Sequence, residues 1–234
     1  MSLFSLPVRC SALRGMAPAA LLLLATAQCL PLQDIERANT LLIQGEYREA
    51  RRMFSRAVER NPLSFDAQYG LGMTWCAEAL HRTELNLAQP DDWFTAVYHM
   101  TRAQTLRDDP QARQTLAILH YNLGTSFHRS AQTGAAIARL EQAVSYDSTQ
   151  IKALNLLGAL YHEQGRLDDA ARCYRSVVAL VPGYAMGHFN LGAVAWARTA
   201  FDSAADHFAR ALEHAPGNEH FSLWLSRARE RMEG

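Results

Sequence analysis

The apolar positions of this chain fall into blocks whose spacing is typical of paired helices. The segment "LGALYHEQGRLDDAARCYRSVVALVP", residues 157–182, places small residues and large rings at fixed separations: Gly158, Ala159, Ala170, Tyr161 and Tyr174. Two helices that pack closely need this size complementarity, because protein interiors are close-packed. Gly165 tolerates the positive φ of a tight turn, and Pro182 disfavours helix at the residue before it. The segment therefore predicts two antiparallel helices joined at Gly165.

The same order of small, large and helix-breaking residues returns along the chain with a period of 34 residues. The matching segments are residues 120–148, 188–216 and, less completely, 45–62. They carry equivalent residues at the same places: Gly124, Ala136, Leu140 and Ala143; Gly192, Ala204, Phe208 and Pro216; Ala50, Phe54, Ala57 and Pro62. One such unit cannot bury its own apolar face, whereas stacked units share a continuous core. The pattern thus predicts a helical repeat array.

These units resemble the tetratricopeptide repeat (TPR), a helix-turn-helix unit of about 34 residues. The resemblance implies an all-α fold, a right-handed TPR superhelix (α-solenoid) of five helix-turn-helix units plus a C-terminal cap helix. We expect the TPR array to occupy residues 28–218, with units at 31–64, 65–116, 117–150, 151–184 and 185–218. Residues 219–234 follow as the cap helix, because Phe221, Leu225 and Ala228 form an apolar stripe at helical spacing. Charged residues cover its outer side: Arg227, Glu230 and Arg231.

In TPR proteins the first helix of each unit lines a concave groove, and the resemblance carries this role onto fixed positions of each first helix. The partner-binding residues expected on this basis are Tyr69, Met73, Tyr121, Thr125, His128, Arg129, Lys152, Asn155, His162, Phe189 and Trp196. Their polar centre and apolar end suit an extended peptide or a partner helix. For the apolar residues of the fifth unit, contact with the cap helix is the alternative interpretation.

Some TPR proteins hold the C-terminal carboxylate of chaperones with Lys and Asn residues at fixed places. Asn122 and Lys152 match two of these places. Other residues occupy the remaining places: Tyr121, Thr125, Met73 and Leu156. We therefore expect no carboxylate clamp.

The second unit departs from the regular length. It carries about 12 extra residues at 81–92, and about six more precede the third unit. We expect the insertion to lengthen the helix pair and add a surface loop. A binding surface is the alternative, because insertions in repeats often map to binding faces. Asp109 is expected to cap a helix with Pro110 at its first position. The first helix of the third unit then begins about two turns early and builds a shoulder beside the groove.

The N-terminal segment has the composition of a secretory signal. Arg9 and Arg14 precede an apolar run at residues 16–27, and no acidic residue occurs up to its end. The run is shorter than the roughly 20 residues that span a bilayer, and its Ala-x-Ala ending predicts cleavage after Ala27. We expect residues 1–27 to be a signal peptide and the mature chain to be exported to a bacterial periplasm. An exposed apolar tail or a misassigned start is the alternative.

Cys29 leaves a second possibility open, because bacterial lipoproteins carry their lipid on a cysteine just after the signal. Thr26 and Gln28 stand where a lipobox usually has Leu and Gly or Ala, which favours cleavage before Gln28. A lipid on Cys29 would instead anchor the chain to the envelope. After cleavage three cysteines remain, and this odd number gives no complete disulfide framework. Cys76 and Cys173 are therefore expected to be buried free thiols.

Charge and motifs argue against nucleic acid and against chemistry. The 23 basic and 23 acidic residues form no block of like charge, whereas a nucleic-acid surface needs a clustered basic face. The motifs HExxH, CxxC, the P-loop and GxSxG are absent. Among the nine histidines, His120 and His188 share one repeat position, and His128 and His162 share another. Packing explains such positions without a metal. We expect no enzyme, no cofactor, no metal and no small-molecule substrate.

The sequence therefore predicts a non-catalytic scaffold that binds a protein or peptide partner in the concave groove. The alternative is a TPR lipoprotein, lipidated on Cys29, that assists the assembly of a pilus, secretin or other envelope complex. Membrane contact is expected only with that lipid or with an uncleaved signal. The fold alone names no partner, because TPR proteins share a fold and not a function.

Overall fold

A computed structural model describes residues 33–84 and 90–233, and regular structure in these ranges is helical throughout, without a strand. Residues 33–43 form the first of these helices. The helices that follow are α2 (Tyr47–Arg60), α3 (Phe65–Glu84), α4 (Pro90–Leu106), α5 (Pro110–Arg129), α6 (Thr133–Tyr146), α7 (Ile151–Glu163), α8 (Leu167–Leu180), α9 (Ala185–Ala197), α10 (Phe201–His214) and α11 (Glu219–Glu233).

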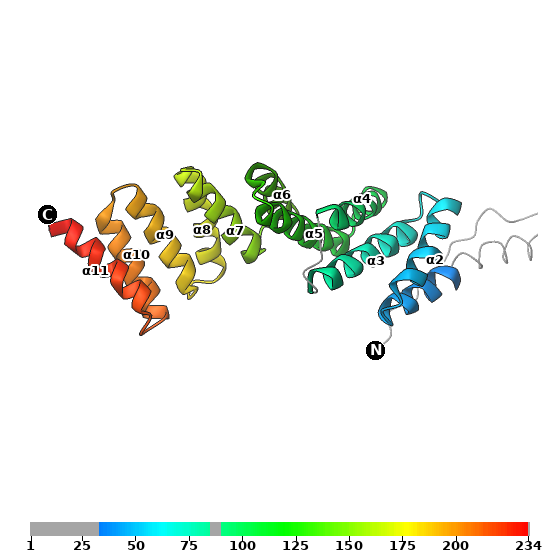
Figure 1. The fold of residues 1–234 in the computed structure, drawn as a ribbon, viewed down its shortest axis with the longest axis horizontal. Helices are drawn as coiled ribbons and strands as arrows, with labels where there is room; N and C mark the ends of the chain where they lie inside the picture. Colours follow the sequence, from blue (N-terminus) through cyan, green and yellow to red (C-terminus); the bar gives the residue numbers. More distant parts are fainter. Residues whose placement is uncertain (1–32, 85–89, 234) are drawn as a thin grey trace, which may run out of the picture.

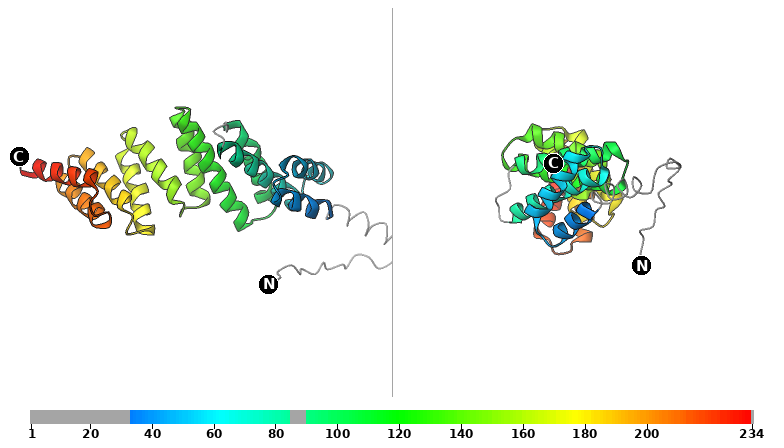
Figure 2. Two further views of the ribbon diagram at one scale, coloured as in Figure 1. Left: turned by 60° about the horizontal axis from the view of Figure 1, so that its bottom comes forward. Right: turned by 90° about the vertical axis from the view of Figure 1, so that its right-hand side faces the viewer.

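The helices are arranged as consecutive pairs in a solenoid. From α2 onward, contacts join each helix to the next one in the chain, and a core cluster with Ala38 and Phe54 joins residues 33–43 to α2. Figures 1 and 2 show the pairs side by side along the longest axis, with α2 near one end and α11 at the other. The predicted all-α repeat architecture is confirmed.

In the three pairs from α5 to α10, a glycine of the first helix lies against a large side chain of the second. A Cβ added at Gly158 would lie 2.8 Å from the Tyr174 ring, and one at Gly192 would lie 2.6 Å from the Phe208 ring. Real Cβ atoms do not approach other atoms this closely, so the two helices can meet only where the side chain is absent. The size complementarity predicted from the spacing is confirmed in these pairs.

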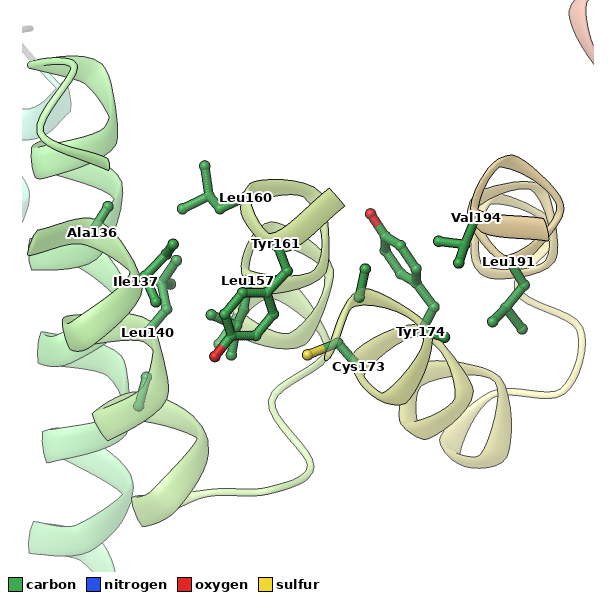
Figure 3. Packing of buried hydrophobic residues seen from close by; sticks show 14 residues of the cluster. Ala136, Ile137, Leu140, Leu157, Leu160, Tyr161, Cys173, Tyr174, Leu191 and Val194 are labelled. Atoms are coloured by element: carbon green, nitrogen blue, oxygen red, sulfur yellow. The ribbon is translucent and has the colours of Figure 1, made fainter. Parts of the chain in front are cut away.

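The core runs from one pair into the next. Figure 3 shows one cluster that draws side chains from α6, α7, α8 and α9: Ile137, Leu140, Leu157, Leu160, Tyr161, Tyr174, Leu191 and Val194 among others. Side-chain caps contribute little to most of these helices, since α2, α6, α7, α8, α9 and α10 have none at the N-terminus. The array is therefore held mainly by its interfaces, as expected for stacked repeats.

The insertion at 81–92 lengthens the helices of the second pair. Residues 81–84 continue α3, and Pro90 begins α4, while residues 85–89 lie outside the described residues. The early start of α5 is confirmed as well: the Asp109 carboxylate accepts hydrogen bonds from the backbone N–H groups of Gln111 and Ala112, both at 3.0 Å. Because α5 begins at Pro110, it crosses the expected boundary between the second and third units.

The cap helix and the cysteines lie as the sequence predicts, where they are described. In α11 the stripe of Phe221, Leu225 and Ala228 is buried. Cys76 and Cys173 are buried free thiols, and burial is the largest cause that raises each thiol pKa to about 11. The expected signal peptide and Cys29 lie outside the described residues. Within those described, no helix is both long and apolar enough to cross a bilayer.

The turns between paired helices use a left-handed residue at one repeat position. Gly45 and Gly165 have φ values of +80° and +72°. Ala131 and Thr199 stand at the same place in their units and also have positive φ, 57° in each case. A non-glycine residue in this region is strained, because its Cβ crowds the following carbonyl oxygen.

We expect Thr199→Gly to stabilise the array by about 1 kcal/mol, because glycine avoids the strain of a β-branched residue at positive φ. Gly165→Ala is the reverse change and should destabilise it by about 1 kcal/mol. Since a Cβ at Gly165 would meet nothing within 4 Å, its effect is confined to the backbone. Urea unfolding measures the free energy of unfolding of both variants and of the wild type. Equal stabilities for Thr199→Gly and the wild type would show that this turn is unstrained.

Candidate functional site

The residues expected to bind a partner lie on the first helices of successive pairs, and none of them is fully buried. Arg129 and Lys152 are exposed. The other nine are half-buried: Tyr69 and Met73 on α3, Tyr121, Thr125 and His128 on α5, Asn155 and His162 on α7, and Phe189 and Trp196 on α9. These eleven residues form a row along the first helices, called the first-helix row below. Other side chains of the array cover the residues at its two ends, and its middle is more open.

The middle of the row contains a small polar pocket of about 130 Å³. Three predicted residues line it from α5: Tyr121, Thr125 and Arg129. Asn122 and Ser126 of the same helix complete this wall, and Thr83 and Trp93 form the other. The second wall exists because the insertion extends α3 as far as Glu84 and places Trp93 near the start of α4.

Thr83 is a site residue that the repeat could not identify, because it belongs to the insertion, which has no counterpart in the other units. Trp93 directly follows the insertion. Trp93 is 2% exposed and belongs to the core cluster between α3, α4 and α5. Its burial gives the pocket a rigid side. The unusual length of the second unit was the signal in the sequence that could have pointed to this wall.

Two cations in this region have no acidic partner. Arg129 and Lys152 form no ion pair with any residue in the described ranges. Many other arginines are paired, for example Arg51 with Glu78 at 2.8 Å and Arg107 with Asp66 at 3.7 Å. Arg129 at the end of α5 and Lys152 at the start of α7 therefore each carry a positive charge that no described carboxylate neutralises, and such a charge can attract a carboxylate.

On α7, two buried polar atoms lack hydrogen bonds. These atoms are Oδ1 of Asn155 and Nε2 of His162, and neither has a partner among the described residues. A buried polar atom without a hydrogen bond costs about 1–3 kcal/mol. Both atoms are enclosed by the array in this structure, so their hydrogen-bonding capacity is unused.

At the N-terminal end of the row, Tyr69 and Met73 are engaged in packing. The Tyr69 ring stacks on Phe65 with ring centroids 5.5 Å apart. The Thr115 hydroxyl lies 3.9 Å from Met73 Sδ. Thr115 belongs to the additional turns at the start of α5, so the early start of that helix covers part of the surface expected to be open.

At the other end of the row, Phe189 and Trp196 contact the cap helix. Phe189 stacks on Phe221 at 4.9 Å, and Trp196 meets Trp224 edge-on at 5.3 Å. This is the alternative interpretation given for the apolar residues of the fifth unit. The candidate site is therefore the polar centre on α5 and α7.

The histidines at the first shared repeat position serve packing. His120 stacks on Tyr146 and His188 stacks on His214, each with ring centroids 5.6 Å apart. His188 Nε2 also lies 2.9 Å from the Pro182 carbonyl oxygen and donates a hydrogen bond to it. The described residues contain no group of three or more His, Cys, Asp or Glu side chains that could hold a metal ion.

The pKa of His120 is lowered from 6.5 to about 4, mainly by burial and secondly by the positive charge of Arg139. The unfolded chain therefore takes up a proton below about pH 6.5 that the folded chain takes up only near pH 4. The contribution of His120 to stability is therefore fully present above pH 6.5 and is lost as the pH falls toward 4. From pH 7 to pH 5 the loss due to this group is about 2 kcal/mol.

We expect His120→Leu to remove that part of the acid sensitivity, because leucine fills the same repeat position as Leu154 and does not titrate. Urea unfolding at pH 7 and pH 5 measures the difference. His81→Leu, a substitution of an exposed histidine, is the matched control. A His120→Leu variant that loses as much stability as the wild type would contradict the assignment.

Comparison with known sequences identifies the repeat. A family model described as tetratricopeptide repeat matches residues 35–81, 121–185 and 157–219, which together exceed half of the chain. The chain is also similar to Hsp70-Hsp90 organizing protein 3 of Arabidopsis thaliana, with 21% identity over 118 residues, or 50% of this chain. The matched region is 21% of that protein, so the chain spans about a fifth of its length.

Solved structures show the same fold. The MamA protein has a TM-score of 0.51 and 21% identity, with 79% of this chain and 91% of that chain covered. YrrB, a TPR protein with an unusual peptide-binding site, has a TM-score of 0.51 and 20% identity over 84% and 90%. The first TPR of Spaghetti (RPAP3), bound to the HSP90 peptide SRMEEVD, has a TM-score of 0.50 and 17% identity over 52% and 96%.

Proposed function

We propose, since this chain belongs to the tetratricopeptide repeat family, that it is a non-catalytic scaffold which binds an extended peptide segment of a protein partner. The family and the solenoid fold support a role in protein interaction. The relatives support peptide binding in particular, because one is bound to an HSP90 peptide and another has a peptide-binding site.

The peptide occupies the polar centre of the first-helix row on α5 and α7. The observation that carries this assignment is the pair of unsatisfied buried atoms, Asn155 Oδ1 and His162 Nε2. A change of side-chain rotamer exposes these atoms to an extended peptide. Asn155 Oδ1 then accepts from a main-chain N–H group, and His162 Nε2 bonds to a carbonyl or an N–H group, according to the imidazole tautomer. The same peptide places one side chain in the pocket beside Tyr121 and Arg129.

That side chain is acidic in the proposed complex. Arg129 lines the pocket, and Lys152 adds a second unpaired cation on α7. A pocket of about 130 Å³ accommodates one Asp or Glu side chain and little more. The arrangement differs from the chaperone carboxylate clamp, because only Asn122 and Lys152 match that clamp, and other residues occupy its remaining places: Tyr121, Thr125, Met73 and Leu156.

We expect a Tyr121→Ala, Asn155→Ala double variant to bind acidic peptides at least about tenfold more weakly than the wild type. The first change removes a side chain that lines the pocket, and the second removes the acceptor Asn155 Oδ1. An array of ten-residue peptides, with and without Asp and Glu, measures the effect. Arg175→Ala is the matched control, since Arg175 is exposed on α8 and lies outside the row. Circular dichroism establishes that the double variant remains folded.

If the folded double variant binds the same peptides as the wild type, the site is elsewhere on the array. If peptides without acidic residues bind as well as acidic ones, the role given to Arg129 and Lys152 is wrong.

We further propose that the mature chain is exported, from the composition of residues 1–27, and that it acts in a bacterial periplasm. The competing proposal is a lipoprotein anchored through Cys29, which would assist the assembly of a pilus, secretin or other envelope complex. Only the sequence supports these proposals, because residues 1–32 lie outside the described structure.

We expect the intact mass of the chain purified from its native cells to match a polypeptide that begins at Gln28 and carries no lipid. Cleavage after Ala27 leaves this terminus. A diacylated Cys29 would favour the lipoprotein, and a chain that retains Met1 would contradict both proposals.

A further inference from the structure

A second surface, apart from the first-helix row, lies between α10 and α11. It is a pocket of about 640 Å³ with mainly apolar walls. Its apolar lining consists of Ala209, Leu212, Pro216 and Leu225. Two carboxylates, Glu213 and Glu219, stand at the turn between the helices, and neither is paired with a described residue.

An equivalent pocket occurs earlier in the array, where a following helix covers it. A pocket of about 320 Å³ lies between α6 and α7. Four of its lining residues precede four residues of the larger pocket by two repeat periods: Glu141, Val144, Leu154 and Leu157 correspond to Ala209, Leu212, Ser222 and Leu225. The smaller pocket is closed on one side by α8, which contributes Arg172, Cys173 and Ser176. Figure 3 shows Cys173 directed from α8 toward Tyr161 of α7.

The next pair is covered in the same way. His207 of α10 stands one repeat period after Cys173, is half-buried, and lies with its ring centroid 6.2 Å from that of His188. In both places the second helix of the pair lies over the gap between the preceding two helices. No described residue occupies the corresponding position beside α10 and α11.

We propose that this pocket docks an amphipathic helix of a partner protein, which lies antiparallel to α11 as α8 lies against α7. The occupant is a helix because helices cover the equivalent positions in the two preceding pairs. It packs its apolar side on Leu212 and Leu225. This inference concerns a different surface from the peptide site and does not rest on the proposed function.

The side chain at position 226 restricts the sequence of the docked helix. Ser226 of α11 stands where α7 and α9 have Gly158 and Gly192. A Cβ at Gly158 would lie 2.8 Å from the Tyr174 ring, so the Cβ of Ser226 excludes a ring at the matching place of the occupant. The docked helix therefore carries a small residue there, unlike α8 and α10.

The charge of the pocket restricts the last turn of the docked helix. In an antiparallel arrangement this turn lies beside the start of α11, where Glu213 and Glu219 are located. Lysine or arginine in the last turn of a helix pairs with these carboxylates and also interacts favourably with the helix dipole.

The probe is a synthetic helix based on α8. It has the sequence of residues 167–181 with Tyr174→Ala and Leu180→Lys, and a hydrocarbon staple joins positions 175 and 179, which are exposed in α8. The staple removes most of the cost of forming a short helix in water. We expect fluorescence anisotropy to show saturable binding to the full chain, with a dissociation constant on the order of 10 µM. A scrambled stapled peptide is the control.

Three substitutions in the chain, one of them a control, test where the helix docks and whether it lies antiparallel to α11. Ser222→Arg adds bulk and positive charge to the pocket wall and should weaken binding about tenfold. Leu223→Arg is the matched control, because Leu223 is exposed on the same helix and does not line the pocket. A peptide that keeps Tyr174 should bind the wild type about tenfold more weakly, and Ser226→Gly should restore its binding.

The proposal is overturned if the probe fails to bind, if the scrambled peptide binds equally well, or if Ser222→Arg and Leu223→Arg have the same effect. It is also overturned if sedimentation shows a dimer of the chain alone that Ser222→Arg dissociates, because the occupant is then a second copy. Restored binding of the Tyr174 peptide by Ser226→Gly supports the antiparallel placement directly. These expected results do not depend on the peptide site, and they hold even if the first-helix row binds no peptide.

Discussion

The array depends on the close approach of two helices at a position that has no side chain. Gly124, Gly158 and Gly192 each face a large residue of the following helix, at distances where a Cβ would collide. These contacts hold the two helices of a pair at a short separation, and stacking of the pairs then fixes the first helices beside one another. The proposed binding surface is a consequence of this packing, since its residues come from helices far apart in the sequence.

Irregularities in the array decide which parts of that surface remain open. The longer α5 covers Met73 with Thr115, and the longer α3 supplies Thr83 to the wall that it forms with Trp93 of α4. The cap helix covers Phe189 and Trp196. What remains is the centre on α5 and α7, where the charges are unpaired and the buried polar atoms lack partners. The open part of the row is thus bounded by the places where the repeat is interrupted or ended.

The period of the sequence predicted the fold well because packing repeats with it. It identified the glycines and the large residues that face them. Helical spacing identified the buried stripe of α11, and the Asp109–Pro110 pair identified the start of α5. The period could not show that Thr115 reaches Met73 or that Thr83 lines the central pocket, because those residues belong to segments without counterparts in other units. Nor could a position within the repeat show that Asn155 and His162 would lack hydrogen bonds, since this depends on every neighbouring side chain.

The central claim is that a partner lies along α5 and α7. Photocrosslinking in native cells tests it most directly, with a benzophenone amino acid placed at Ser126, which lines the central pocket, or at Ser176 on α8. The account predicts a discrete protein adduct from position 126 that Arg129→Ala weakens, and no such adduct from position 176. An adduct from position 176 alone would contradict it.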